Sequence, residues 1–192
     1  MYTRRFRKAD ITDLVLNQTD FISPELAERL GKQVINELGS AYLYFAMSAK
    51  CGTASYHGFE KFFYEKAEEE IEHANKVKQI MIDMNKPIKF YAIPEINFMG
   101  SDLIEMFKQF LEAEKKVTQQ WIEIRELCDK DSRYAAVCLN ETIDWFLREQ
   151  IEEENEAADL LTLITKSRGD MSAILAIENR FFCDNKDFNS ND

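Results

Sequence analysis

The chain of 192 residues is acidic, with 35 Asp and Glu against 24 Lys and Arg and a formal net charge of -11. This balance argues against nucleic acid and anionic membranes as partners and favours cations. The length suits one domain with a sizeable core, and no apolar run approaches the roughly 20 residues that span a bilayer.

Both ends of the chain are expected to lie outside the domain. Residues 1–22 form an extension with a short basic cluster and no apolar middle of the kind that a signal peptide needs. A transit peptide is the weaker alternative, because aspartates interrupt the segment. We expect a retained arm that is flexible or contacts a partner. Residues 184–192 form a polar tail.

The cysteines are Cys51, Cys128, Cys138 and Cys183, and no two of them form a Cys-x-x-Cys pair. This scatter favours free thiols in a reducing compartment over a thiolate metal site. We therefore expect a cytoplasmic protein.

Residues 23–168 are predicted to form four long helices, near 23–52, 58–85, 101–128 and 132–166. Their apolar residues recur at alternating steps of three and four, which is the spacing of a bundle helix. Ser23 is a good N-cap, and Pro24 lacks only a donor that would be unpaired anyway. Gly169 is a C-cap candidate for the fourth helix. A fifth, short helix is expected within residues 169–183, and it needs a surface to pack on.

The segment from Asn85 to Gly100 contains two prolines and has no helical period. About 15 residues can span close to 50 Å, whereas a 27-residue helix is about 40 Å long. This segment can therefore cross the full length of a bundle. The predicted fold is an all-α four-helix bundle with one long crossover between the second and third helices and a short fifth helix.

Each apolar stripe is interrupted by polar residues near its middle. The interrupting residues are Glu37, Glu70 with His73, Glu114, and Gln150 with Glu153. In one helix, a tolerated polar residue or a drift of helical phase would be the better explanation. An interruption near the middle of all four stripes instead favours one polar layer that binds metal. Four carboxylates, an amide and an imidazole suit iron or manganese better than structural zinc, and a pair of divalent cations would offset the cost of burying these charges.

From Ser23 to Phe182 the chain resembles the ferritins, specifically the bacterial non-haem type. The motifs that carry the resemblance are Asn36-Glu37-Leu38, Glu69-Glu70-Ile71-Glu72-His73, Glu114 and Glu149-Gln150-Ile151-Glu152-Glu153-Glu154. Ferritin-like di-iron bundles supply one Glu from each of two helices and a Glu-x-x-His from each of the others. Gln150-x-x-Glu153 departs from this pattern as true ferritins do. Bacterioferritins place a haem-binding Met where this chain has Ile71, so no haem is expected.

The resemblance implies a role for each residue of the layer. Glu37, Glu70 and His73 would hold the first iron, with Glu70 bridging to a second iron held by Glu114 and Glu153. Gln150 would sit beside the second iron and orient peroxide or water. Tyr44 would be a redox-active or hydrogen-bonding neighbour, and a core tyrosine with a satisfied hydroxyl is an equal alternative. Glu69, Glu149 and Glu152 would form a third iron position, against the alternative of a solvated acidic face.

The implied function is iron storage and detoxification. A ferroxidase would oxidise Fe(II) to Fe(III) with O2 or peroxide, and a hollow shell of 24 chains, with the fifth helix around its fourfold axis, would hold the mineral. Two alternatives are a di-iron oxidase or peroxide scavenger that stores no iron, and a helical scaffold with a vestigial metal site. The number of iron ions retained per chain distinguishes these three functions.

Overall fold

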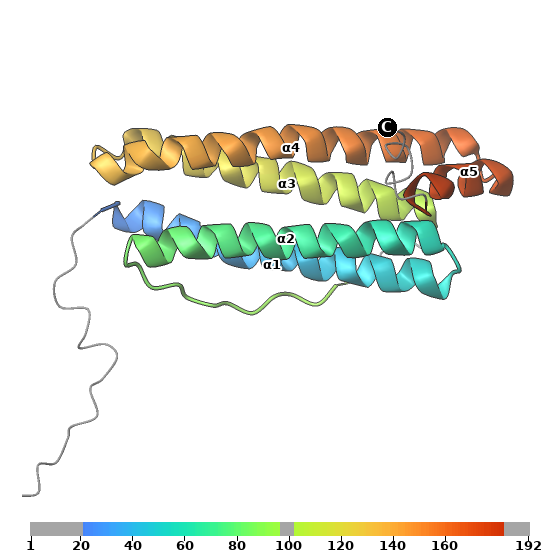
Figure 1. Ribbon diagram of the computed structural model, residues 1–192, viewed down its shortest axis with the longest axis horizontal. Coiled ribbons are helices and arrows are strands. Elements are labelled where there is room, and N and C mark those ends of the chain that lie inside the picture. The colour runs from blue at the N-terminus through green and yellow to red at the C-terminus, as the bar shows by residue number, and fades with distance from the viewer. Residues whose placement is uncertain (1–20, 97–101, 183–192) are drawn as a thin grey trace, which may run out of the picture.

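The computed structural model describes residues 21–96 and 102–182, so most of the expected arm, Cys183 and the polar tail lie outside the described residues. Within these two ranges five helices follow one another: α1 (Pro24–Thr53), α2 (His57–Asp83), α3 (Leu103–Lys130), α4 (Tyr134–Ser167) and α5 (Met171–Phe182). The predicted all-α bundle with a short fifth helix is thereby confirmed (Figure 1). None of the helices within the described ranges has the length and apolar character needed to cross a bilayer.

The helix ends follow local sequence rules. The Ser23 side chain accepts a hydrogen bond from the Leu26 amide, and the Asp102 side chain accepts one from the Glu105 amide. Both therefore pair an amide that the helix itself leaves free. At the end of α4 the C-cap is Arg168, with a left-handed φ of 51°, rather than Gly169, which follows it with a φ of 78°.

The four long helices form two pairs, α1 with α2 and α3 with α4, and the two pairs contact each other through α1 and α3. The helices within each pair run antiparallel (Figure 1). After α2 the chain runs back along the bundle beside α1, so that α2 and α3 point in the same direction (Figure 1). This is the crossover that the length of the connection predicts.

Among the described residues, the apolar core consists of two separate clusters, one towards each end of the bundle. The Trp121 cluster takes its residues from 22–34, 74–81, 117–128 and 135–146. The Phe107 cluster takes its residues from 44–51, 59–67, 103–110, 157–164 and α5. On every long helix, the residues between the two clusters include the predicted polar interruption. The polar layer thus lies between two apolar clusters of one bundle.

The predicted stripes match the buried faces of the long helices except at the end of α2. Alternating steps of three and four from His73 and Val77 predict Ile80 and Met84 as the next buried residues, but both are only half-buried and Met81 is buried instead. The prediction was wrong there because a straight helix of 3.6 residues per turn drifts away from a regular three-four pattern. Before α1, Ile22 is fully buried in the Trp121 cluster, so packing begins inside the segment expected to be an extension.

The short helix α5 packs on α2 and α4 at one end of the bundle (Figure 1). Its Glu178 is buried, and Oε1 of that residue accepts hydrogen bonds from the amides of Gly58, at 2.8 Å, and Phe59, at 3.3 Å. A carboxylate from α5 therefore caps the N-terminus of α2, where it also meets the positive end of the helix dipole. Gly58 permits this approach, because a Cβ there would lie 2.6 Å from the Glu178 carbonyl oxygen.

Candidate metal centre

The six polar residues that interrupt the stripes meet in one buried layer. None is more than 4% exposed, and together they are Glu37, Glu70, His73, Glu114, Gln150 and Glu153. They meet because each sits on the inward face of its own helix, between the two apolar clusters. Helical periodicity thus brings residues more than a hundred positions apart in sequence into one site.

Two groups of ligand atoms share Glu70. One group is Glu37, Glu70 and His73, and the other is Glu70, Glu114 and Glu153; in each, the potential ligand atoms all lie within 4.8 Å of one another. His73 Nδ1 lies 3.6 Å from Glu70 Oε2, too far for a hydrogen bond. A carboxylate common to two groups can bridge two cations, so the layer has the donors for a pair of metal ions.

The outer carboxylates are held by donors from neighbouring helices. Glu37 Oε1 accepts hydrogen bonds from Gln33 Nε2 and Trp121 Nε1, both at 3.0 Å. Glu37 Oε2 has no partner, so this oxygen is the one left for a metal ion. Neither Trp121 nor Gln33 was among the residues predicted for the site. The position of Gln33 one turn before Glu37 was an available signal for an i, i+4 contact.

Glu114 is held from both sides. The Tyr44 hydroxyl donates to Glu114 Oε1, and Gln150 Nε2 lies 3.3 Å from Glu114 Oε2. Tyr44 is fully buried, with its ring edge-on to Phe110 at 5.1 Å between centroids. The tyrosine is therefore both a core residue with a satisfied hydroxyl and a direct neighbour of a candidate ligand.

Unpartnered oxygens are concentrated in this layer. Across the described part of the chain, five buried side-chain polar atoms lack a hydrogen-bond partner. Four of them are Glu37 Oε2, Glu70 Oε2 and both carboxylate oxygens of Glu153. A buried acceptor without a donor costs roughly 1–3 kcal/mol, and a charged one costs more. Bound cations would remove this cost, so these residues fit oxygen-preferring metal ions.

Burial shifts the pKa values of the layer so that its carboxyls favour the protonated form, which metal binding must reverse, and its imidazole favours the neutral form, which metal binding needs. Burial raises the pKa of Glu37 to about 7 and that of Glu153 to about 9. Burial, together with the neighbouring Glu37 charge, raises the pKa of Glu70 well above its ordinary value. Burial lowers the pKa of His73 to about 4, so its imidazole is neutral and can donate a lone pair at pH 7. Binding a cation would displace protons from the carboxyls.

Of the three residues expected at a third iron position, the structure brings one to the layer. Glu69 is half-buried and forms a third group of possible ligand atoms with His73 and Glu153. Glu149 is half-buried and Glu152 is exposed, and neither belongs to any such group within the described residues.

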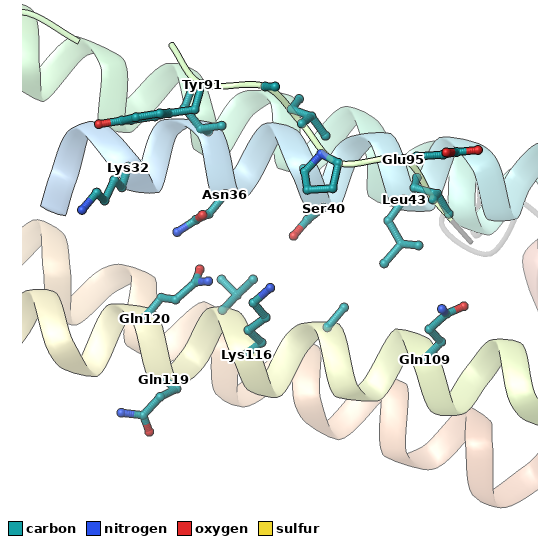
Figure 2. Close-up of a pocket in the computed structure, with 18 of the residues that line it drawn as sticks. Lys32, Asn36, Ser40, Leu43, Tyr91, Glu95, Gln109, Lys116, Gln119 and Gln120 are labelled. Atoms are coloured by element: carbon teal, nitrogen blue, oxygen red, sulfur yellow. The ribbon is translucent and has the colours of Figure 1, made fainter. Parts of the chain in front are cut away.

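A groove of about 820 Å³ lies outside this layer, between α1, α3 and the crossover. Figure 2 shows Lys32, Asn36 and Ser40 of α1 facing Lys116 and Gln120 of α3, with the crossover above α1. Three cationic side chains line the groove, namely Arg29, Lys32 and Lys116. Two carboxylates, Glu95 and Glu123, also line it, so the cations outnumber the acids and, within the described residues, no group of possible metal ligands lies there. The buried layer is therefore the candidate metal centre.

Comparison with known proteins gives a consistent result. A family model described as a ferritin-like domain matches residues 27–167. The chain is 33% identical to a bacterial non-heme ferritin of Staphylococcus aureus over 159 residues, covering 82% of this chain and 93% of that protein. It is 35% identical to one of Staphylococcus haemolyticus over 134 residues, covering 70% and 79%. Among solved structures, an open pore ferritin from the archaeon Archaeoglobus fulgidus superposes with a TM-score of 0.79 at 26% identity, covering 85% of this chain and 98% of that chain.

Proposed function

The chain belongs to the ferritin family, and from this premise we propose that it stores and detoxifies iron as a ferroxidase. Fe(II) is oxidised at the buried layer by O2 or H2O2, and the ferric product is kept as a mineral. The observation that carries the proposal is the pair of ligand groups joined by Glu70. Four buried carboxylate oxygens of these two groups have no hydrogen-bond partner. A helical scaffold that binds no metal would bear the cost of burying these oxygens without any compensation.

Each ligand has a role in binding two Fe(II) ions as substrates. Glu37 and His73 bind the first ion, Glu114 and Glu153 bind the second, and Glu70 bridges the two. Gln150 donates its amide towards Glu114 and sits beside the second ion. Trp121 and Gln33 occupy Glu37 Oε1, which leaves Oε2 for the first ion.

The electrons balance with either oxidant. Two Fe(II) ions give one electron each, and with two protons they reduce O2 to H2O2 or reduce H2O2 to two molecules of water. The centre holds the two ions side by side, so both electrons are delivered to one oxidant. Carboxylates stabilise Fe(III) more than Fe(II) because the charge on the ion is larger. Tyr44 donates a hydrogen bond to Glu114 and so is in direct contact with a ligand of the second ion.

We also propose that the mineral lies inside a shell of 24 chains. Large apolar side chains stay exposed on α1 and α2, namely Tyr42, Phe45, Tyr64 and Ile71. Several of them line a hollow of about 700 Å³ beside the crossover. Such an exposed patch supports contact with neighbouring copies of the chain. The helix α5 is held on the end of the bundle, where it can contact the α5 helices of neighbouring copies.

The remaining expectations belong to the same proposal. Iron is bound without haem, because Ile71 replaces the haem-binding Met of bacterioferritins. Nucleic acid and membranes are not partners, in keeping with the acidic charge of the chain. The cytoplasm is the proposed compartment, and the free thiols of Cys51, Cys128 and Cys138 support it.

Iron retention tests this function. A large aerobic excess of Fe(II) is added to metal-free protein, which is then desalted and its iron counted, while stopped-flow absorbance follows oxidation. His73→Ala should abolish fast oxidation and leave a folded protein. The matched control is His57→Ala, because His57 is the other histidine of the chain and its side chain is 62% exposed. That variant should oxidise iron at the wild-type rate.

Tens of irons or more per chain support storage in a shell. A plateau near two would identify a di-iron oxidase without a store, and a value near zero would leave only a scaffold. Fast oxidation by the His73→Ala variant would overturn the assignment of the centre.

A further inference from the structure

Lys66 of α2 lies at the edge of the metal centre that faces α4. Its Nζ is 3.0 Å from Glu69 Oε2, 2.9 Å from Glu156 Oε2 and 3.8 Å from Glu153 Oε1. The Lys66 side chain is only 14% exposed. One ammonium group is thus surrounded by three carboxylates from two helices.

Two of these carboxylates are also potential metal ligands. Glu69 and Glu153 form a ligand group with His73, and Glu153 has no hydrogen-bond partner for either oxygen. A metal ion and the ammonium group would therefore compete for the same oxygens. They would also repel each other at close range in a poorly solvated site.

We propose that Lys66 acts as a built-in cation that limits the centre to two metal ions. This inference rests on the two-ion centre proposed above and adds a residue to it. The ammonium fills the position at the α2–α4 edge that Glu69 and Glu153 would otherwise offer to a third divalent cation. Lys66 is thus a positioning residue, which acts on the bound metal through the carboxylates that it holds.

The inference predicts a change in stoichiometry. Replacing Lys66 with glutamine removes the positive charge and leaves three carboxylates facing one another. Like charges in such a site favour the binding of a cation. The Lys66→Gln variant should therefore bind three divalent ions per chain, whereas the wild-type protein and a Lys66→Arg variant should bind two.

Zn²⁺ is the probe, because it does not change oxidation state during the titration. Metal-free proteins are titrated calorimetrically at pH 7 to count tight sites per chain, and anomalous scattering from zinc-soaked crystals locates the ions. The matched control is Lys108→Gln. Lys108 pairs with Glu105 at the same i, i+3 spacing as Lys66 with Glu69, but on the exposed surface of α3. The control should bind two ions.

Three ions in the Lys66→Gln variant, with the third between Glu69 and Glu153, support the inference. Two ions in that variant, or three in the wild-type protein, overturn it and leave the two-ion centre intact. Fewer than two in all four proteins would instead overturn the centre itself. If the variant fails to fold without metal, it is refolded with Zn²⁺, desalted and its zinc counted. Three zinc ions per chain then support the inference, and two overturn it.

Discussion

Replacing Glu153 with glutamine should stabilise the metal-free protein at alkaline pH while it weakens metal binding. Glu153 is 4% exposed, and neither of its carboxylate oxygens has a hydrogen-bond partner. Burial, with the Glu114 charge as the next cause, raises its pKa from 4.5 to about 9. The folded metal-free protein therefore keeps a proton on this carboxyl at a pH where the unfolded chain has released it.

The pH dependence follows from this difference in proton binding. Between the two pKa values of Glu153, the folded state holds one more proton than the unfolded state, so the free energy of unfolding falls as the pH rises. Each pH unit corresponds to about 1.4 kcal/mol. From pH 6 to pH 8 the wild-type protein should lose roughly 2–3 kcal/mol from this one group.

Glutamine does not titrate, so the variant escapes this loss. It retains a buried amide without a partner, which costs roughly 1–3 kcal/mol. The wild-type protein has already lost about 2 kcal/mol between pH 4.5 and pH 6, which is similar to the cost of the buried amide. The two proteins should therefore be similar near pH 6, and the variant should be more stable by about 2–3 kcal/mol at pH 8. In a protein of this size that difference corresponds to roughly 4–12 °C in Tm.

Thermal unfolding followed by circular dichroism measures the effect, with a chelator present and at one protein concentration. Glu156→Gln is the matched control. Glu156 contacts the same Lys66 from the same helix, but its side chain is 41% exposed. The control should show no gain in stability that widens with pH.

Added Zn²⁺ should raise the Tm of the wild-type protein more than that of Glu153→Gln. A Glu153→Gln protein that is less stable than wild type at pH 8, or a gap that does not widen from pH 6, would refute the reasoning.

Two further predictions concern contacts at and beyond the centre. Trp121→Phe removes one of the two donors to Glu37 Oε1 and should weaken Zn²⁺ binding roughly 10-fold or more by calorimetry; unchanged affinity would show that the indole does not position this ligand. Gly58→Ala places a Cβ 2.6 Å from the Glu178 carbonyl oxygen. It should displace α5 at a cost of about 1–3 kcal/mol, seen as a lower Tm and faster limited proteolysis within α5, and an unaltered cleavage pattern would count against this packing.

The sequence by itself determined the helices, the crossover and the membership of the polar layer. Helical spacing fixes which residues share a face, so the order of residues alone places Glu37, Glu70, His73 and Glu114 on inward faces. The length of residues 85–100 was enough to make α2 and α3 parallel. These features depend on contacts within one helix or on the reach of the chain, and both can be worked out from the amino-acid sequence.

Only the tertiary structure decided how the layer is held and what surrounds it. Trp121 and Gln33 converge on one oxygen of Glu37, Tyr44 reaches Glu114, and Lys66 crosses from α2 to the acids of α4. Each contact depends on the rotation of one helix about its own axis against a neighbour. Spacing along a single helix does not fix that rotation, because it is set by how all side chains of the bundle pack together.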